Sequence, residues 1–560
     1  GTGETAWEGA PVEAGEVDRW GTGYYYTMRF DEVKKPGQYY IEVIDNNGAA
    51  RRSYPFKIGQ NLLETSTLSA VGYYFKAQRS TGEYEAADKN IPFMYGKREG
   101  RIDAHGGWYD ATGDYGVHLS HLSHTTYFNP QQAAFSAYAF FKMNDLLEEA
   151  EYPYYTMLKR RLIEEGMYGA DFLMRMRAPS GSFFVTKSRT MDAYGPVASL
   201  RVLACYFRNP TGRKGGGSWG NVDDITDYDY ETSFRAGGGY AIAALAYAAR
   251  VTYPSDYTKE EYLQAAVSSY DYLYAHNELY ANDGKWNLVD EYCALDALVE
   301  IYKTTKEIDY LRRARAMAKR IIDRYIAVNE TMGYLRVNDT DRPFFHAADA
   351  GMPVVNLLNY CEIERQPEEK AAVLAVCEKL MRHELFVTNE VANPFGYARQ
   401  FVQHGDGSKT TQFFYPHDVE TAPWWQGENA RIASLATAAR SLSHHTQDAA
   451  LAAALRKYAD DQINWVLGLN PFDSCMLEGE GRNNIDYFFE GDRRDFIQCP
   501  GGIVNGITSG LHDEHGIAYY SAPTSEVDDN WRWAEQWIPH ASWYMYALCM
   551  KKIYTPYPFF

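Results

Sequence analysis

The chain has 560 residues, of which 46% are hydrophobic and 23% are charged, and its formal net charge at pH 7 is −19. This length predicts two or more domains, or one large barrel with an appendage. The negative charge argues against nucleic acid, an anionic membrane surface or a polyanion as partner, because each of these needs clustered Lys and Arg. A neutral polymer is a partner compatible with this charge.

Aromatic residues are the unusual feature of the composition, with 47 Tyr, 26 Phe and 12 Trp. Aromatic rings offer flat apolar faces with polar tips, which suit the C–H faces and hydroxyls of sugars. A large helical core that uses many aromatics explains the same numbers equally well, so both interpretations stay open.

The seven cysteines are scattered without a CxxC pair or metal-ligand spacing, so they predict no disulfide framework. No apolar stretch reaches the length of a membrane span. The chain begins at Gly1-Thr2 with neither Met nor a leader, which we interpret as a trimmed or mature product.

Residues 1–58 have the pattern of β-strands. The segments 23–30 and 38–43 are rich in aromatic and β-branched residues, and turn signals stand at 36–37 and 46–48. This pattern predicts an immunoglobulin-like β-module. Because such a sandwich needs about 100 residues, we expect the module to be partial, with its first strands missing from this chain.

From residue 59 to 560 the hydrophobic spacing becomes helical; Leu288, Tyr292 and Leu295, for example, lie on one stripe. Twelve such segments with no strand pattern between them predict six antiparallel hairpins closed into an (α/α)6 barrel, a mainly α fold. No repeat unit supports an α-solenoid. The expected helices are 60–78, 117–148, 152–176, 233–252, 258–278, 286–305, 308–328, 345–365, 367–384, 428–445, 447–467 and 535–553.

Long loops interrupt the helical pattern at 79–116, 177–232, 385–427 and 468–534. Loops of this length within a compact domain are usually functional. We expect them to gather at one end of the barrel and form a cleft.

The first loop contains two acidic residues in a glycine-rich and aromatic setting, Gly-Gly-Trp-Tyr-Asp-Ala-Thr-Gly-Asp-Tyr-Gly over residues 106–116. Glycine lets the backbone turn sharply and direct side chains inward. The carboxylates of Asp110 and Asp114 could hold a water between them, and the ionised one could take its proton. An ordinary polar loop or a loop Ca²⁺ site are the alternatives.

A second acidic site stands near the C-terminus, where Trp533 and Trp537 flank Glu535. Aromatic surroundings disfavour the ionised carboxylate and raise its pKa, as a general acid requires. We expect Glu535 to begin the last helix, where the helix dipole would instead lower that pKa. Glu526 competes for the same role.

The two acidic segments together resemble glycoside hydrolase family 9, and the resemblance extends over essentially the whole chain. In that family a Gly-Gly-Trp/Tyr-x-Asp-Ala-Gly-Asp loop comes early in the barrel and an acidic Glu comes near the C-terminus. Other segments with family resemblance are 53–59, at the joint between an immunoglobulin-like module and the barrel, 233–239, 290–295, and Leu-Gly-Leu-Asn-Pro at 467–471.

The resemblance implies an inverting mechanism. It assigns Asp114 as the general base, Asp110 as the residue that helps position the water, and Glu535 as the acid that protonates the leaving oxygen. Inversion needs carboxyl groups about 6.5–9.5 Å apart so that a water fits.

The sequence departs from the family pattern in two places. Thr112 is inserted in the aspartate loop, so that Asp110 and Asp114 become four residues apart. The family's His-x-Arg substrate-binding stretch after Asn-Pro is not evident, and Arg482 is its nearest substitute. Both departures bear on which sugar lies next to the bond that is cut.

Several further residues are candidates for lining the cleft. Paired Trp at a junction of loop and helix suit stacking on a sugar, and packing at the barrel rim is the alternative. His346, at the start of a helix, is expected to be structural. Oxygen-rich residues near Trp219 leave a structural Ca²⁺ site open, against a solvated acidic loop. The predicted sugar-binding residues are Trp108, His417, Trp424, Trp425, Arg482 and Trp533, and the acidic loop holds Asp223, Asp224, Asp227 and Asp229.

We therefore expect an inverting endo-β-1,4-glucanase that acts on cellulose chains, mixed-linkage glucan or xyloglucan and needs no cofactor. The resemblance places it as a bacterial protein, secreted or at the cell surface or in the periplasm, and we expect a monomer. An exo-acting β-glucosidase or glucosaminidase of the same family is the first alternative, and a non-catalytic glycan-binding surface protein is the second. An isomerase or phosphorylase on the same barrel has no motif in its favour.

Overall fold

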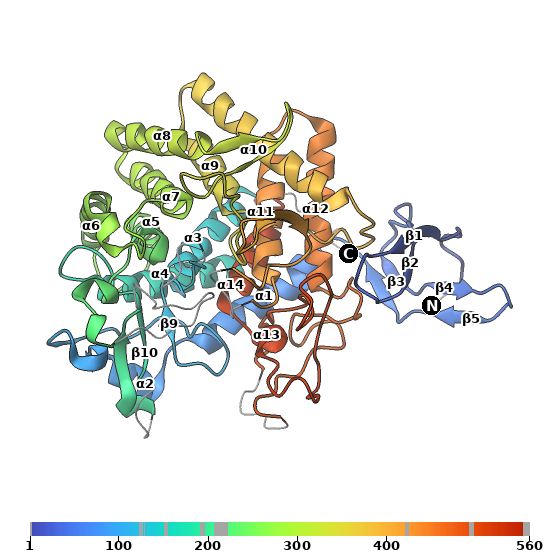
Figure 1. Ribbon diagram of the computed structural model, residues 1–560, viewed down its shortest axis with the longest axis horizontal. Coiled ribbons are helices and arrows are strands. Elements are labelled where there is room, and N and C mark those ends of the chain that lie inside the picture. Colours follow the sequence, from blue (N-terminus) through green and yellow to red (C-terminus); the bar gives the residue numbers. More distant parts are fainter. Residues whose placement is uncertain are drawn as a thin grey trace.

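The computed structural model describes residues 3–121, 127, 129–150, 155–190, 197–206, 222–419, 425–491 and 498–552. A small strand-rich segment at the N-terminus stands beside a large helical body (Figure 1). The change from strands to helices comes between Ile58 and Leu62, close to the predicted boundary at residue 59.

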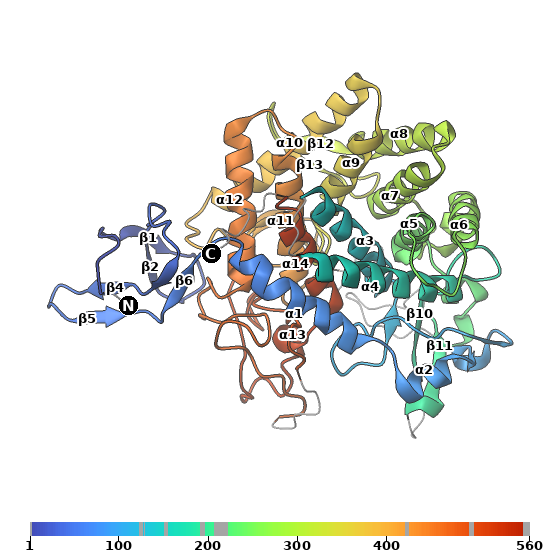
Figure 2. The same ribbon diagram turned by 180° about the vertical axis from the view of Figure 1, so that it is seen from behind.

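The N-terminal strands form three antiparallel pairs, β1 with β2, β3 with β6 and β4 with β5. This segment projects from one side of the body in both views (Figures 1 and 2). Trp20 anchors it, because its buried ring lies 4.7 Å from the ring of Phe413 in the body. An immunoglobulin-like fold for this segment stays a prediction. The strands are β1 (Val12–Glu16), β2 (Tyr24–Thr27), β3 (Gly37–Tyr39), β4 (Glu42–Ile44), β5 (Ala50–Arg52) and β6 (Phe56–Ile58).

Six helices form an inner ring in which each contacts the next, and the ring closes where α14 packs on α3. Every residue of α5, α11 and α14 is buried. The helix α11 is rich in Ala and Ser, whose small side chains let neighbouring helices approach closely. The inner helices are α3 (Ala133–Glu149), α5 (Gly239–Ala248), α7 (Leu288–Thr305), α9 (Met352–Ile363), α11 (Asn429–Ser443) and α14 (Ile538–Cys549).

Six further helices surround this ring, each packed on an inner helix: α4 on α3, α6 on α5, α8 on α7, α10 on α9, α12 on α11 and α1 on α14. Their sequences are amphipathic; α8 buries Leu311 and Met317 but exposes Arg312. Two layers of paired helices are the barrel that the hydrophobic spacing predicts. The outer helices are α1 (Leu62–Gln78), α4 (Thr156–Arg175), α6 (Lys259–Tyr280), α8 (Ile308–Ile322), α10 (Pro367–Asn389) and α12 (Ala449–Val466).

Short strands lie between the helices, where the sequence has no strand pattern. The predicted helix 117–148 begins only at Ala133, and Val117–His118 is instead strand β9, which pairs with β10. Strands of two to four residues are too short to give a period-2 signal in the sequence. The strands are β7 (Ile91–Pro92), β8 (Arg101–Ile102), β9, β10 (Thr186–Arg189), β11 (Arg201–Ala204), β12 (Tyr325–Ala327), β13 (Gly333–Leu335), β14 (Gln400–Gln403) and β15 (Lys409–Gln412).

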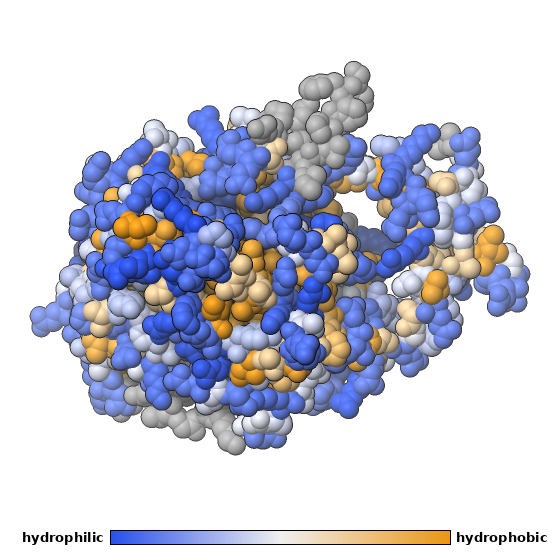
Figure 3. Space-filling view, turned by 90° about the horizontal axis from the view of Figure 1, so that it is seen from above, coloured by the Kyte–Doolittle hydropathy of each residue, from blue (hydrophilic) through white to orange (hydrophobic). Residues whose placement is uncertain are grey.

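Two short helices in the long loops were not predicted, α2 (Gly82–Asp88) and α13 (Trp531–Ala534). The last long helix begins at Ile538 rather than at residue 535. Seen from above, the surface is mainly hydrophilic with hydrophobic residues near the middle of the face (Figure 3). Among the described residues, no helix has the length and apolar character to cross a membrane.

Close packing between α9 and α11 can be tested at Gly351. A Cβ atom added there would lie 2.1 Å from the backbone oxygen of Ser434, so Gly351→Ala should push the two inner helices apart. Overpacking of this kind costs about 1–3 kcal/mol. We expect a lower melting temperature, measured by calorimetry or circular dichroism.

Gly72→Ala is the matched control, because its Cβ would meet Met545 at an ordinary 3.8 Å inside helix α1. Ala is favoured over Gly within a helix by about 0.5–1 kcal/mol, so the melting temperature should stay or rise. An equal loss in both variants would contradict the packing argument.

Candidate active site

Two backbone hydrogen bonds join the aspartate loop to the chain segment that follows Glu535. The N–H of Thr112 donates to the carbonyl of Gln536 at 3.0 Å, and the N–H of Ile538 donates to the carbonyl of Asp110 at 2.9 Å. Segments more than 400 residues apart are therefore paired like two short strands. This pairing brings the three predicted carboxyl groups into one site.

The inserted residue Thr112 strengthens this pairing. Its hydroxyl donates to the side-chain carbonyl of Gln536 at 2.7 Å and accepts from the amide of Gln78 at 3.3 Å. Gln536 is fully buried and also accepts the N–H of Cys499 at 2.7 Å. The departure from the family pattern thus fixes the position of the loop.

The two aspartates differ in their surroundings. Asp110 is buried, and burial followed by the charges of Asp114 and Glu535 raises its pKa well above the usual value. Asp114 is exposed, and its carboxylate accepts the backbone N–H groups of Tyr115 at 2.5 Å and Gly116 at 3.3 Å. Burial and neighbouring charge thus disfavour the ionised form of Asp110, whereas Asp114 faces solvent.

Glu535 follows helix α13 with an extended backbone, and α14 begins three residues later. Its pKa is raised to about 8, first by burial and then by the charge of Asp114, while a hydrogen bond from Asn505 at 3.4 Å opposes the shift. The prediction that Glu535 begins the last helix was wrong. Glu535 therefore does not lie in the first turn of that helix, where the helix dipole would lower its pKa. The competing candidate, Glu526, is exposed.

Two residues beside these carboxyl groups were not predicted. The Nε2 atom of His118 lies 3.6 Å from a carboxyl oxygen of Asp110, and burial lowers the pKa of this imidazole to about 3. Asn505 is fully buried and hydrogen-bonds with His540 at 2.8 Å. His118 stands only four residues after Asp114 in the sequence, which could have indicated a place in the site. It was not considered because residues 117–148 were expected to form a helix.

The family assignment follows from comparison with known proteins. The sequence profile described as Glycosyl hydrolase family 9 matches residues 65–490. The chain belongs to glycosyl hydrolase family 9. The matched segment contains Asp110 and Asp114 and ends before Glu535. A search of curated protein sequences finds no match.

Solved structures of the family share the fold, and their barrels confirm the (α/α)6 prediction. A metagenome-derived glycoside hydrolase family 9 endoglucanase is 16% identical, with a TM-score of 0.61 over 98% of this chain and 90% of the other. A family 9 protein of Bacteroides ovatus is 15% identical, with a TM-score of 0.61 over 98% and 93%. Endoglucanase CelQ from Clostridium thermocellum, complexed with cellotriose, is 16% identical, with a TM-score of 0.51 over 88% and 70%.

In this glycosyl hydrolase, one aromatic pair predicted to bind sugar lies together. The ring of His417 stacks on Trp425 with centroids 3.8 Å apart, and His417 hydrogen-bonds with the hydroxyl of Ser509 at 2.6 Å. Burial lowers the pKa of His417 to about 4. Trp425 retains 8% exposure. Trp424 lies outside the described residues.

Three other residues predicted to contact sugar have partners within the chain. Trp108 is fully buried, and its indole N–H donates to Glu165 at 3.0 Å. Trp533 is 1% exposed. The guanidinium of Arg482 lies 3.8 Å above the ring of Tyr54, where the N-terminal segment meets the barrel. Both Trp rings fill the core and the arginine contacts another part of the chain, and sugar binding by these three residues stays a prediction.

The acidic loop near Trp219 gives no assembled set of ligands in the described residues. Trp219 itself lies outside them. Asp223 pairs with Lys97 at 3.2 Å, and Asp229 accepts the N–H of Thr226 at 2.7 Å. Structural Ca²⁺ therefore stays a prediction.

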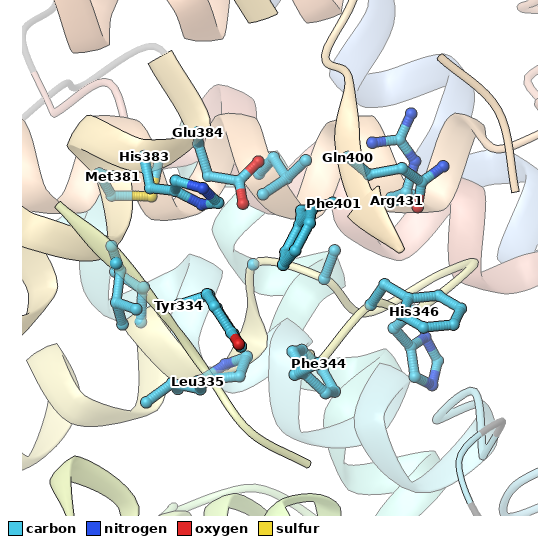
Figure 4. A pocket seen from close by; sticks show the side chains of 18 residues that line it. Tyr334, Leu335, Phe344, His346, Met381, His383, Glu384, Gln400, Phe401 and Arg431 are labelled. Atoms are coloured by element: carbon cyan, nitrogen blue, oxygen red, sulfur yellow. The ribbon is translucent and has the colours of Figure 1, made fainter. Parts of the chain in front are cut away.

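A small pocket opens between α9, α10, α11 and the strands β13 and β14. Figure 4 shows Glu384 and Arg431 on one side of it and Tyr334 and Phe344 on the other. Burial raises the pKa of Glu384 to about 7 against the opposing charge of Arg431. His346, expected to be structural, lines this pocket and accepts backbone N–H groups at 3.0 and 2.8 Å.

The role of Thr112 can be tested by Thr112→Val, which keeps the shape of the side chain and removes its hydroxyl. Each lost neutral hydrogen bond should reduce the free energy of unfolding by about 0.5–1.5 kcal/mol. Because the aspartate loop would be held less firmly against the Glu535 segment, we also expect a lower kcat. Thr112→Ser keeps the hydroxyl and should behave like the wild type in denaturant unfolding and hydrolysis. If Thr112→Val has the stability and kcat of the wild type, the hydrogen bonds of the Thr112 hydroxyl do not hold the loop in place.

Proposed function

We propose that this protein hydrolyses β-1,4-glucosidic bonds of a glucan with inversion of the anomeric carbon. Asp114 takes the proton of the attacking water, Asp110 helps to hold that water, and Glu535 protonates the leaving oxygen. The observation that carries this proposal is the pairing of the aspartate loop with the Glu535 segment, since it joins an exposed carboxylate and a protonated carboxyl group in one site.

The protonation states suit these roles. A general acid must hold its proton at the working pH, and Glu535 does so because burial raises its pKa to about 8. Asp114 faces solvent, and its carboxylate accepts two backbone N–H groups that hold it in place. This division of roles between an acid and a base resembles the two-carboxylate scheme of inverting glycosidases.

A neutral β-glucan is the proposed substrate class. The net charge of −19 disfavours polyanions, so a neutral chain fits the protein better than a charged one. Among proteins of similar fold, endoglucanase CelQ has been crystallised with cellotriose, and AaCel9A has been crystallised with cellobiose-like isofagomine. We propose an endo-acting monomer that works outside the cytoplasm on cellulose chains, mixed-linkage glucan or xyloglucan.

Replacement of the acid gives the sharpest test. Glu535→Gln should lower kcat by about 10²–10⁴ because the leaving oxygen is no longer protonated, while calorimetry shows unaltered binding of a cello-oligosaccharide. Glu526→Gln, at an exposed site, is the matched control and should retain activity.

The same assay separates the alternatives. Proton NMR of the wild-type reaction should show the α-anomer first, and an initial β-anomer would refute inversion. Product sizing on a long oligosaccharide distinguishes endo from exo action, since an exo enzyme releases one small product early. A wild type that binds glucan but never cuts it would be a glycan-binding protein.

The raised pKa of Glu535 predicts an alkaline limb in the pH profile. The acid loses its proton as the pH rises through about 8, so kcat/KM should fall about tenfold per pH unit above that value. An aryl glycoside whose leaving group needs no protonation is the control and should show a much weaker alkaline limb. The same decline for both substrates would assign it to another group.

A further inference from the structure

A group of three potential metal ligands includes Asp110. Asp110, His118 and His121 each offer one ligand atom, and these atoms lie within 4.8 Å of one another. The 3.6 Å between His118 Nε2 and Asp110 Oδ2 is too long for a hydrogen bond. Two ligands on one tetrahedral Zn²⁺ stand about 3.4 Å apart, given Zn–N and Zn–O bonds of roughly 2.0–2.2 Å. The spacing therefore suits a shared cation.

The other carboxyl oxygen of Asp110 supplies a second observation. Asp110 is 4% exposed, and its Oδ1 atom is buried with no hydrogen-bond partner among the described residues. Buried carboxyl oxygens ordinarily have a partner, because an unsatisfied one costs about 1–3 kcal/mol. A bound cation would supply it.

Two hydroxyl groups lie against the far side of the His118 ring. Its Nδ1 atom lies 2.6 Å from the hydroxyl of Thr186 and 2.7 Å from the hydroxyl of Tyr206, and the Thr186 hydroxyl also lies 3.2 Å from the carbonyl of Val117. In the tautomer that carries its proton on Nδ1, both hydroxyl oxygens accept from the Nδ1–H, and the Thr186 hydroxyl donates to the Val117 carbonyl. The lone pair of Nε2 then faces Asp110, and the Thr186 contact is the outer-shell partner that metal-binding imidazoles have.

We propose that Asp110, His118 and His121 bind Zn²⁺, and that zinc bound there inhibits the hydrolase. Two imidazoles with one carboxylate are a typical ligand set for zinc. The metal would bind the carboxylate of Asp110, which would then no longer be able to help hold the attacking water. The inhibition rests on the proposed function, whereas the binding does not.

A second group with ligand spacing, His404, Asp418 and Glu514, is explained without a metal. Nδ1 of His404 lies 3.0 Å from Asp418 and 3.3 Å from Glu514, and its Nε2 lies 2.9 Å from the hydroxyl of Thr410. Both ring nitrogens thus have hydrogen-bond partners. This group serves as the control for the first.

Binding is tested with zinc chloride titrated into the EDTA-treated full chain by isothermal calorimetry. The wild type should bind one Zn²⁺, and His118→Ala and His121→Ala should each lose this site, while His404→Ala keeps it. Thr186→Val should weaken binding by about 10–100-fold, as loss of an outer-shell partner does. Absence of zinc binding, or its loss only in His404→Ala, overturns the proposal.

Circular dichroism of each variant guards against unfolding. His118 is buried, so His121→Ala, at a half-buried position, decides the outcome if His118→Ala does not fold. A visible spectrum of bound Co²⁺ that disappears in His121→Ala would support direct ligation, and a spectrum unaffected by that change would contradict it.

Inhibition is measured on a cello-oligosaccharide across the same zinc concentrations. Half-inhibition should coincide with the wild-type Kd, be reversed by EDTA, and move with Kd in Thr186→Val. Zinc binding with full hydrolysis retained overturns the inhibitory role. Zinc binding by a chain that hydrolyses no glucan would refute the proposed function and leave the metal site in place.

Discussion

The antiparallel pairing of the aspartate loop with the segment 536–538 is the contact on which the site depends. Helix α14 packs on α1 and α3, and backbone hydrogen bonds of 2.9 and 3.0 Å fix the register between residues 110–112 and 536–538. A slip of one residue would turn the side chains to the opposite face of the pair. The fixed register keeps Glu535 beside Asp110 and Asp114.

Burial then gives the three carboxyl groups different properties. Like charges close together resist simultaneous ionisation, and the buried members lose their charge first. Asp110 and Glu535 have raised pKa values, whereas Asp114 stays exposed. The same crowding that favours a protonated acid also makes the site attractive to a cation, since a divalent ion relieves the repulsion that burial intensifies.

The sequence predicted the barrel well because twelve long helices carry strong period-3.6 signals, and it located the catalytic candidates because motif and glycine content coincide. The sequence did not predict features that depend on the tertiary structure alone, such as the burial of a particular side chain. Whether a Trp stacks on a sugar or fills the core, as Trp108 and Trp533 do, depends on neighbours far along the chain. His118 was missed because a strand of two residues has no detectable period.

The inserted Thr112 accounts for the contrast between the two aspartates. A turn closes where the N–H of Asp114 donates to the carbonyl of Ala111 at 3.2 Å, and Gly113 has a φ of 86°, which glycine adopts without strain. Asp110 lies before this turn against the barrel, and Asp114 lies after it toward solvent. Because Thr112 is hydrogen-bonded to Gln536, the extra residue lengthens the turn without loosening the loop. One short segment therefore provides both the solvent-exposed Asp114 and the buried Asp110.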